Sequence, residues 1–105
     1  MEEGSICRQV LDRKPVDVGN SFKAGVGKLY CFTRIALLKP PPTEITHVWY
    51  FGRTERARIT LTIKSYHWRT YSSKTILPNE VGDWYVEVLG PEGEALSIME
   101  FRTTR

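Results

Sequence analysis

The sequence predicts an all-β protein, a single antiparallel β-sandwich of about seven to eight strands with an immunoglobulin-like architecture. Several short segments alternate apolar and polar residues with a period of two, which is typical of half-buried strands. Turn residues separate these segments at short intervals, and no segment combines a helical apolar period with caps. The 105 residues are the size of one domain, 1–105, with disordered ends expected at 1–4 and 103–105.

The first third of the chain predicts two strands joined by irregular segments. Ser5 to Leu11 is the first strand, and the charged stretch 12–17 interrupts it. Pro15 lacks a backbone donor, so this stretch belongs at a sheet edge or in a turn. Glycines on both sides of Phe22 indicate a loop that this ring anchors to the core. Lys28 to Leu38 is rich in aromatic and aliphatic residues and is the second strand.

The middle third predicts a hairpin after the stiff proline connector 39–43. In the strand Glu44 to Phe51, alternation places His47, Trp49 and Phe51 on one face, and Val48 and Tyr50 on the other. Both faces are apolar, so the pattern does not decide which one faces the core.

The remaining strands have clearer faces. Arg56 to Lys64 directs Ile59, Leu61 and Ile63 inward and its charged and threonine residues outward. A strand from Trp68 to about Ser73 follows. Trp84 to Val88 alternates again, with residues 84, 86 and 88 inward, and a Gly-Pro-Glu-Gly turn at 90–93 leads into the last strand, Glu94 to Phe101.

Composition excludes several classes of protein. The hydrophobic share of 41% and the twelve aromatic residues exclude a disordered chain. No apolar run approaches the roughly 20 residues of a membrane helix, and the first residues do not resemble a signal peptide. Direct membrane insertion is therefore not expected.

Charge is unevenly distributed along the chain. Residues 1–47 hold seven basic and five acidic residues, residues 48–74 hold six and one, and residues 75–105 hold two and six. The basic middle could face an anion such as a phosphate, an acidic glycan or a lipid headgroup. Alternatively, the acidic last segment neutralises it across adjacent strands, which the pattern slightly favours.

The two cysteines, Cys7 and Cys31, do not form a disulfide framework. They could lie on neighbouring strands and cross-link in an oxidising compartment. Two small buried hydrophobic residues are the favoured interpretation. Two cysteines and two distant histidines do not indicate zinc, so no metal or cofactor is expected.

The candidate ligand-binding residues cluster in the middle of the chain. The stretch 47–74 holds both histidines, two of the three tryptophans and six basic residues against one acidic residue. Aromatic rings beside polar groups can hold sugars, and Trp, Tyr and Arg are also favoured at protein interfaces. Nucleic acid is not expected, because the net charge of +3 is modest and no recognition motif is present. The residues predicted to bind a ligand are His47, Tyr50, Arg58, Tyr66, Trp68, Arg69, Tyr71 and Lys74.

An enzymatic role for His47 or Ser72 is the least favoured interpretation. No Gly-x-Ser-x-Gly elbow or Ser-x-x-Lys motif is present. Hydroxyl pairs at a strand end commonly bond to backbone, as at Ser72 and Ser73, and a histidine near a strand end is commonly a satisfied structural residue.

Several motifs together resemble a bacterial family catalogued as domain of unknown function 2914. They are the stretches 12–17, 30–33, 47–49, 68–74, 77–78 and 82–84, and the closing Phe101. Members of the family resemble modules of membrane or envelope proteins, and the resemblance implies no activity, cofactor or site residue. It implies a bacterial origin and a place in the periplasm or cell envelope.

These observations predict a non-catalytic binding or accessory module of an envelope or polysaccharide-linked system. A carbohydrate ligand is the leading version, and a protein-interaction module without a small-molecule ligand is the alternative. The partner is thus expected to be a glycan or a protein, and the chain a monomer or weak dimer.

Overall fold

The structure, a computed structural model, describes residues 1–105 as nine β-strands with no helix. The strands are β1 (Glu3–Leu11), β2 (Lys14–Val18), β3 (Ser21–Lys23), β4 (Gly27–Ala36), β5 (Thr43–Phe51), β6 (Thr54–Ile63), β7 (His67–Ile76), β8 (Gly82–Leu89) and β9 (Ala95–Thr104).

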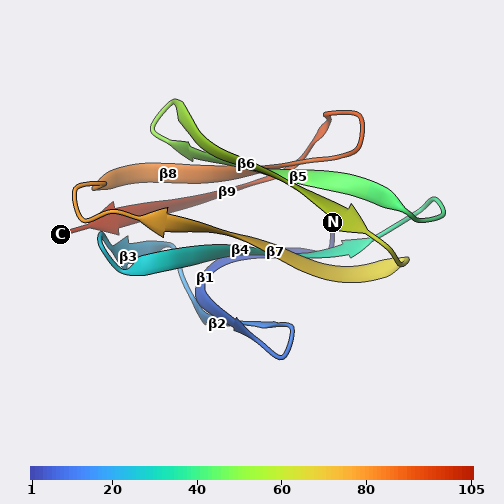
Figure 1. Ribbon diagram of the computed structural model, residues 1–105, viewed down its shortest axis with the longest axis horizontal. Helices are drawn as coiled ribbons and strands as arrows, with labels where there is room; N and C mark the ends of the chain where they lie inside the picture. The colour runs from blue at the N-terminus through green and yellow to red at the C-terminus, as the bar shows by residue number, and fades with distance from the viewer.

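The strands form two sheets that pack face to face (Figure 1). Sheet A has the order β2-β1-β4-β7, and sheet B has the order β3-β9-β8-β5-β6. The predicted all-β, two-sheet architecture is therefore confirmed. No helix is long and apolar enough to span a membrane.

Two short strands account for the difference between the predicted seven to eight strands and the observed nine. β2 lies in the charged stretch that was expected at an edge or turn, and it is the edge strand that carries Pro15. β3 is three residues long and pairs with β9 in parallel, the one parallel pair in an otherwise antiparallel fold. Phe22 in β3 is buried edge-to-face against Phe101 of β9, with ring centroids 6.2 Å apart, so it is the anchor that the sequence predicts.

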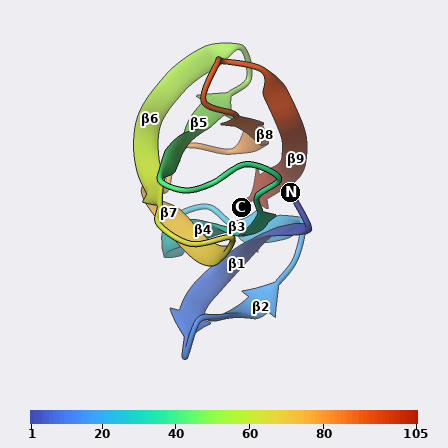
Figure 2. The same cartoon turned by 90° about the vertical axis from the view of Figure 1, so that its right-hand side faces the viewer.

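The β1–β2 hairpin folds over the outer face of sheet A. β1 pairs with β4 over Glu3 to Cys7 and with β2 from Cys7 onward, and the hairpin then lies outside the sheet (Figures 1 and 2). Asp12 and Arg13 form its tip, both with φ near +50 to +60°, as in a two-residue hairpin turn. The Arg13 carbonyl accepts a hydrogen bond from Arg69 of β7, which ties the tip to the far edge of the sheet.

This folded-over hairpin explains why an outward-facing aromatic residue is buried. Phe32 of β4 alternates with Cys31 and Thr33, which face the core, yet only 2% of its surface is exposed. Cys7, directly opposite Tyr30 on β4, is also fully buried. The hairpin therefore adds a third layer over part of sheet A.

The predicted inward residues of β6 and β8 are confirmed. Ile63, Trp84, Val86 and Val88 are almost fully buried in the core between the sheets. The half-buried Ile59 and Leu61 of β6 pack against the same core.

The structure decides which face of β5 points inward. Trp49 is fully buried beside Phe101, and Phe51 packs against Trp84 with ring centroids 4.6 Å apart. His47 lies on the same inner face, and Tyr50 lies on the outer face. The sequence pattern did not distinguish the two faces because Val48 on the outer face is also apolar. In the structure Val48 is fully buried as well.

Both ends of the described chain join the sheets, where disorder was expected at 1–4 and 103–105. The Glu2 amide donates to the Arg34 carbonyl at 2.8 Å, and β1 begins at Glu3. β9 continues to Thr104, and Thr103 is buried.

Candidate functional site

A chain of buried polar side chains joins the two sheets around His47. His47 Nδ1 lies 2.6 Å from Ser72 Oγ, and His47 Nε2 lies 3.2 Å from Thr33 Oγ1. Trp49 Nε1 donates to Ser72 Oγ at 3.0 Å, and Thr33 Oγ1 donates to the Thr70 carbonyl at 3.3 Å. His47 and Trp49 belong to sheet B, whereas Thr33, Thr70 and Ser72 belong to sheet A.

One protonation state satisfies every group in this network. The indole donates to Ser72, so the Ser72 hydroxyl proton is free to donate to His47 Nδ1. Nε2 then carries the imidazole proton and donates to Thr33, whose own proton goes to the Thr70 carbonyl. The opposite tautomer would leave the Ser72 proton without an acceptor. His47 is therefore a neutral, fully satisfied histidine.

Burial keeps His47 neutral and out of reach of solvent. None of its surface is exposed, and desolvation lowers its pKa to about 4. Ser72 is 5% exposed, so neither side chain is open to solvent. The structure places His47, a candidate ligand-binding residue, in the core as the satisfied structural histidine that the sequence analysis also considered, and His47 and Ser72 join the two sheets there.

A second buried network fixes the turn between β7 and β8. Glu80 is 4% exposed; its carboxylate accepts from the Leu77 amide at 2.8 Å and pairs with Arg56 of β6 at 2.6 Å. Thr103 Oγ1 donates to the Glu80 carbonyl and accepts from Trp84 Nε1 at 3.1 Å. Arg56 therefore has a structural role as the ion-pair partner of the buried Glu80.

A surface pocket lies at the end of sheet A, beside the tip of the β1–β2 hairpin. We call it the basic pocket; its cavity volume is about 620 Å³. Figure 2 shows the end of the molecule where the hairpin hangs below sheet A. The residues that line the basic pocket are Glu2, Arg13, Arg34, Ser65, His67, Trp68 and Arg69.

Three arginines from three different elements converge on the basic pocket. Arg34 of β4 and Arg69 of β7 are direct cross-strand partners on the outer face of sheet A. Arg13 comes from the hairpin tip, where its carbonyl accepts from the Arg69 guanidinium at 3.4 Å. Like charges directly opposite each other destabilise a sheet unless an anion lies near them. The pocket therefore carries a local excess of positive charge.

Two carboxylates compensate only part of this charge. Arg34 Nε lies 3.6 Å from Glu3 Oε1 and 3.9 Å from Glu2 Oε1, distances too long for hydrogen bonds. Arg34 Nε is itself buried and has no hydrogen-bond acceptor. Glu2 also lies 4.0 Å from His67 Nδ1. A donor in the site thus remains unsatisfied.

Trp68 is the one hydrophobic residue among those that line the basic pocket. It is half-buried, packing against the core cluster that contains Ile35 while also lining the pocket. Trp68 and Arg69 are thus the two predicted site residues that the structure brings together. Tyr66 is exposed in the turn before β7, between the pocket residues Ser65 and His67.

Tyr71 lies on the same outer face of sheet A as Arg69. It is 50% exposed and meets Tyr30 edge-to-face, with ring centroids 5.8 Å apart. Tyr71 does not line the basic pocket, but it lies two residues from Arg69 along β7 and extends the aromatic surface away from the pocket.

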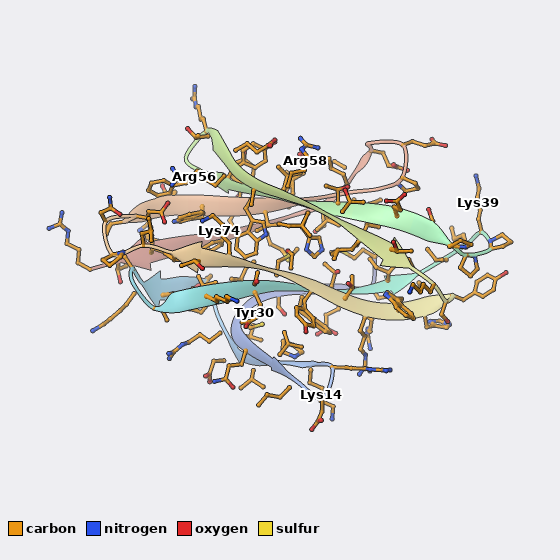
Figure 3. All side chains as sticks on the ribbon, in the orientation of Figure 1. Lys14, Tyr30, Lys39, Arg56, Arg58 and Lys74 are labelled. Atoms are coloured by element: carbon orange, nitrogen blue, oxygen red, sulfur yellow. The ribbon has the colours of Figure 1, made fainter.

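The other predicted site residues lie elsewhere. Tyr50 stacks on Tyr85 at 4.5 Å on the outer face of sheet B, and Arg58 on the same face is paired with Glu55 at 2.9 Å. Figure 3 shows Arg58 and Tyr30 on opposite sides of the sandwich. Lys74 Nζ donates to the adjacent Thr75 carbonyl. The eight predicted residues therefore do not form one site.

Four polar residues of the basic pocket were not predicted as ligand contacts, namely Glu2, Arg13, Arg34 and Ser65. His67 was likewise not predicted as a ligand contact. The bend of β1 brings Arg13 to Arg69, and the β4–β7 register brings Arg34 to Arg69. The local sequence pattern predicts neither of these features.

The two cysteines face opposite sides of sheet A. Cys31 is paired with Ile6 and lies in the core between the sheets, whereas Cys7 is paired with Tyr30 and lies under the hairpin. Both are free thiols, and burial raises the pKa of each. No group of three or more His, Cys, Asp or Glu side chains is arranged to hold a metal ion.

The fold and the basic pocket define a small β-sandwich domain with a basic surface pocket. A family model described as a protein of unknown function, DUF2914, matches residues 42–103. The chain therefore belongs to the DUF2914 family, which confirms the resemblance seen in the sequence. Searches of curated proteins and of solved structures found no match.

The matched range begins just before β5 and ends in β9. It includes Ser65, His67, Trp68 and Arg69, but not the pocket residues from β1, the hairpin tip and β4. The motifs at 12–17 and 30–33 also lie outside it.

Proposed function

We propose that this protein is a non-catalytic binding module that holds an acidic glycan through the basic pocket. The observation that carries this proposal is the convergence of Arg13, Arg34 and Arg69 on one surface pocket. Guanidinium groups bind carboxylate and sulfate or phosphate oxygens through charge-assisted hydrogen bonds, and three of them favour an anionic ligand over a neutral one.

The pocket's shape and wall support a sugar ring beside the anionic group. A volume of about 620 Å³ is in the usual range of small-ligand sites. Trp68 offers an apolar surface and Ser65 a hydroxyl, so a ring could pack while its acidic substituent reaches the arginines. Tyr71 and Tyr30 lie farther along the same sheet face and could contact the next sugar of a chain.

A non-catalytic role is supported by the positions of the reactive side chains. The hydrogen-bonded histidine–serine pair, His47 and Ser72, is buried in the core, where it joins the two sheets. His67 in the pocket has only the Glu2 carboxylate near it, at 4.0 Å, and no serine or cysteine nucleophile is paired with it. The residues around the pocket thus suit binding more than bond cleavage.

The test is binding of uronic-acid oligosaccharides and neutral oligosaccharides of matched length, by glycan array and then by calorimetry. We expect the wild type to bind the acidic set and not the neutral set. Arg69→Ala should weaken binding about tenfold, the equivalent of one charge-assisted hydrogen bond. Arg58→Ala is the matched control, because it removes an exposed arginine from the opposite sheet.

Two results would reject the proposal. One is the absence of binding to every acidic glycan by a correctly folded protein. The other is an equal loss for Arg69→Ala and Arg58→Ala, which would indicate non-specific attraction. A poly-glutamate peptide run in parallel tests the protein-partner alternative: if it binds in an Arg69-dependent manner and no glycan does, a protein partner replaces the glycan.

A further inference from the structure

We propose that the carboxylate of Glu2 occupies the place of the ligand's anionic group, so that ligand binding displaces an internal competitor. This inference rests on the proposed function, since it concerns the same basic pocket. It also specifies the ligand chemistry: the displacing group is a carboxylate, or another oxyanion, that can reach Arg34 and His67.

Glu2 is held at the pocket by its backbone, not by its side chain. Its amide donates to the Arg34 carbonyl at 2.8 Å, which continues the β1–β4 pairing one residue beyond the start of β1. The side chain then projects into the pocket, where it is 43% exposed. The carboxylate can therefore leave the arginines without any strand separating.

The side-chain contacts of Glu2 are electrostatic and incomplete. Its Oε1 lies 3.9 Å from Arg34 Nε and 4.0 Å from His67 Nδ1, and no hydrogen bond forms at either atom. Exposed ion pairs of this kind contribute little to stability. An anion that formed true hydrogen bonds with the guanidinium groups would replace these contacts with stronger ones.

The neighbouring Glu3 has a different role. Glu3 is the direct cross-strand partner of Arg34, at 3.6 Å, and does not line the pocket. It offsets part of the Arg34 charge whether or not a ligand is bound. The two side chains are equally exposed, at 43% for Glu2 and 44% for Glu3, but only Glu2 lines the pocket and so lies where a ligand would bind.

The Arg34 Nε group supplies a donor for the incoming anion. This atom is buried without an acceptor, although a buried unpaired donor is costly. Glu2 and Glu3 both approach it and neither satisfies it. Because this atom is covered in the structure, a ligand oxygen could accept from Arg34 Nε only after Glu2 moves away, and that exchange would remove the cost.

The test compares Glu2→Gln with the wild type, using the same uronic-acid oligosaccharide as probe. Removing a like charge from the site should raise affinity about fivefold, the upper range for an exposed charge interaction. Glu55→Gln, which removes a carboxylate from the opposite sheet face, is the matched control and should leave affinity unchanged. Arg69→Ala should lower affinity in the same assay.

The outcomes separate this inference from the proposed function. Unchanged or weaker binding by Glu2→Gln, with binding still lost in Arg69→Ala, overturns the competitor role but leaves the acidic-glycan site standing. No binding by either the wild type or Glu2→Gln overturns both. A thermal melt of Glu2→Gln tests whether the Glu2 contacts stabilise the fold. A large drop in Tm would show that Glu2 is a structural ion-pair residue and would reject the displaceable role.

Discussion

His47 of sheet B and Ser72 of sheet A are joined across the core by a hydrogen bond of 2.6 Å. The strands that carry them, β5 and β7, lie in different sheets and do not pair with each other. The bond therefore depends on how the two sheets pack and not on backbone pairing within a sheet. Apolar side chains can slide past one another with little loss, whereas a buried imidazole left without its partner is costly. The network around His47 therefore fixes the position of one sheet on the other.

The His47 ring should show its low pKa directly in NMR titration. Its ring resonances are expected to titrate near pH 4, because burial disfavours the imidazolium form. A His47 midpoint near the ordinary value of about 6.5 would show that this ring reaches water.

The same pKa makes stability depend on pH in a defined window. The folded-state pKa lies below the unfolded one, so the unfolded chain binds more protons between pH 6.5 and pH 4, and stability falls as pH falls through that range. The loss from His47 should reach about 2 kcal/mol at pH 5 relative to pH 7, measured by urea denaturation. His67→Gln should retain this loss, and a pH-independent free energy of unfolding would contradict the prediction.

Replacing Ser72 by alanine should destabilise the protein by about 2 kcal/mol, because Trp49 Nε1 loses its acceptor and His47 Nδ1 its donor inside the core. Chemical denaturation measures this loss. Ser73→Ala is the control on the adjacent, outward-facing position, and it should change stability by less than about 0.5 kcal/mol. Equal effects of the two substitutions would show that the buried network does not stabilise the fold.

Glu80→Ala should lower the free energy of unfolding by about 2 kcal/mol. The substitution leaves the Leu77 amide without its acceptor and Arg56 without its ion-pair partner, although the half-exposed Arg56 can turn to water, which limits the loss. Glu100→Ala on the exposed face of β9 is the comparison. If Glu100→Ala destabilised the protein as much, general charge effects would account for the result.

Oxidation should not join Cys7 to Cys31, because their side chains lie on opposite faces of sheet A. Iodoacetamide should leave both thiols unmodified in the native protein and modify both in urea, as judged by intact mass. A monomeric native protein whose intact mass falls by two hydrogen atoms on treatment with an oxidant would contradict the observed facing of the two cysteines.

The sequence predicts best those strands that have one polar face. β6 and β8 alternate cleanly, so their inward residues are correct. β5 remained undecided because the fully buried Val48 gives its outer face the same apolar character as its inner face. β3 was expected as a loop, since its partner β9 lies about 80 residues away and only three residues pair.

The candidate site was only partly predictable for a similar reason. Trp68 and Arg69 were identified because their types favour binding surfaces, and the same argument selected Tyr50 and Arg58 on the opposite sheet. Residue type identifies candidates, but the strand register decides which of them meet. The register that pairs Arg34 with Arg69, and the bend that brings Arg13 to them, arise only from the assembled fold.

Under the proposed function, the folded-over hairpin would couple ligand occupancy to local opening of the chain. Arg13 reaches the basic pocket only while the hairpin lies closed over Phe32, and its tip is held to β7 by one long hydrogen bond from Arg69. An anion that bound both Arg13 and Arg69 would stabilise the closed hairpin. By mass action it would raise the free energy needed to separate the hairpin from the sheet. Amide hydrogens of β2 would accordingly exchange more slowly as the anion concentration rises.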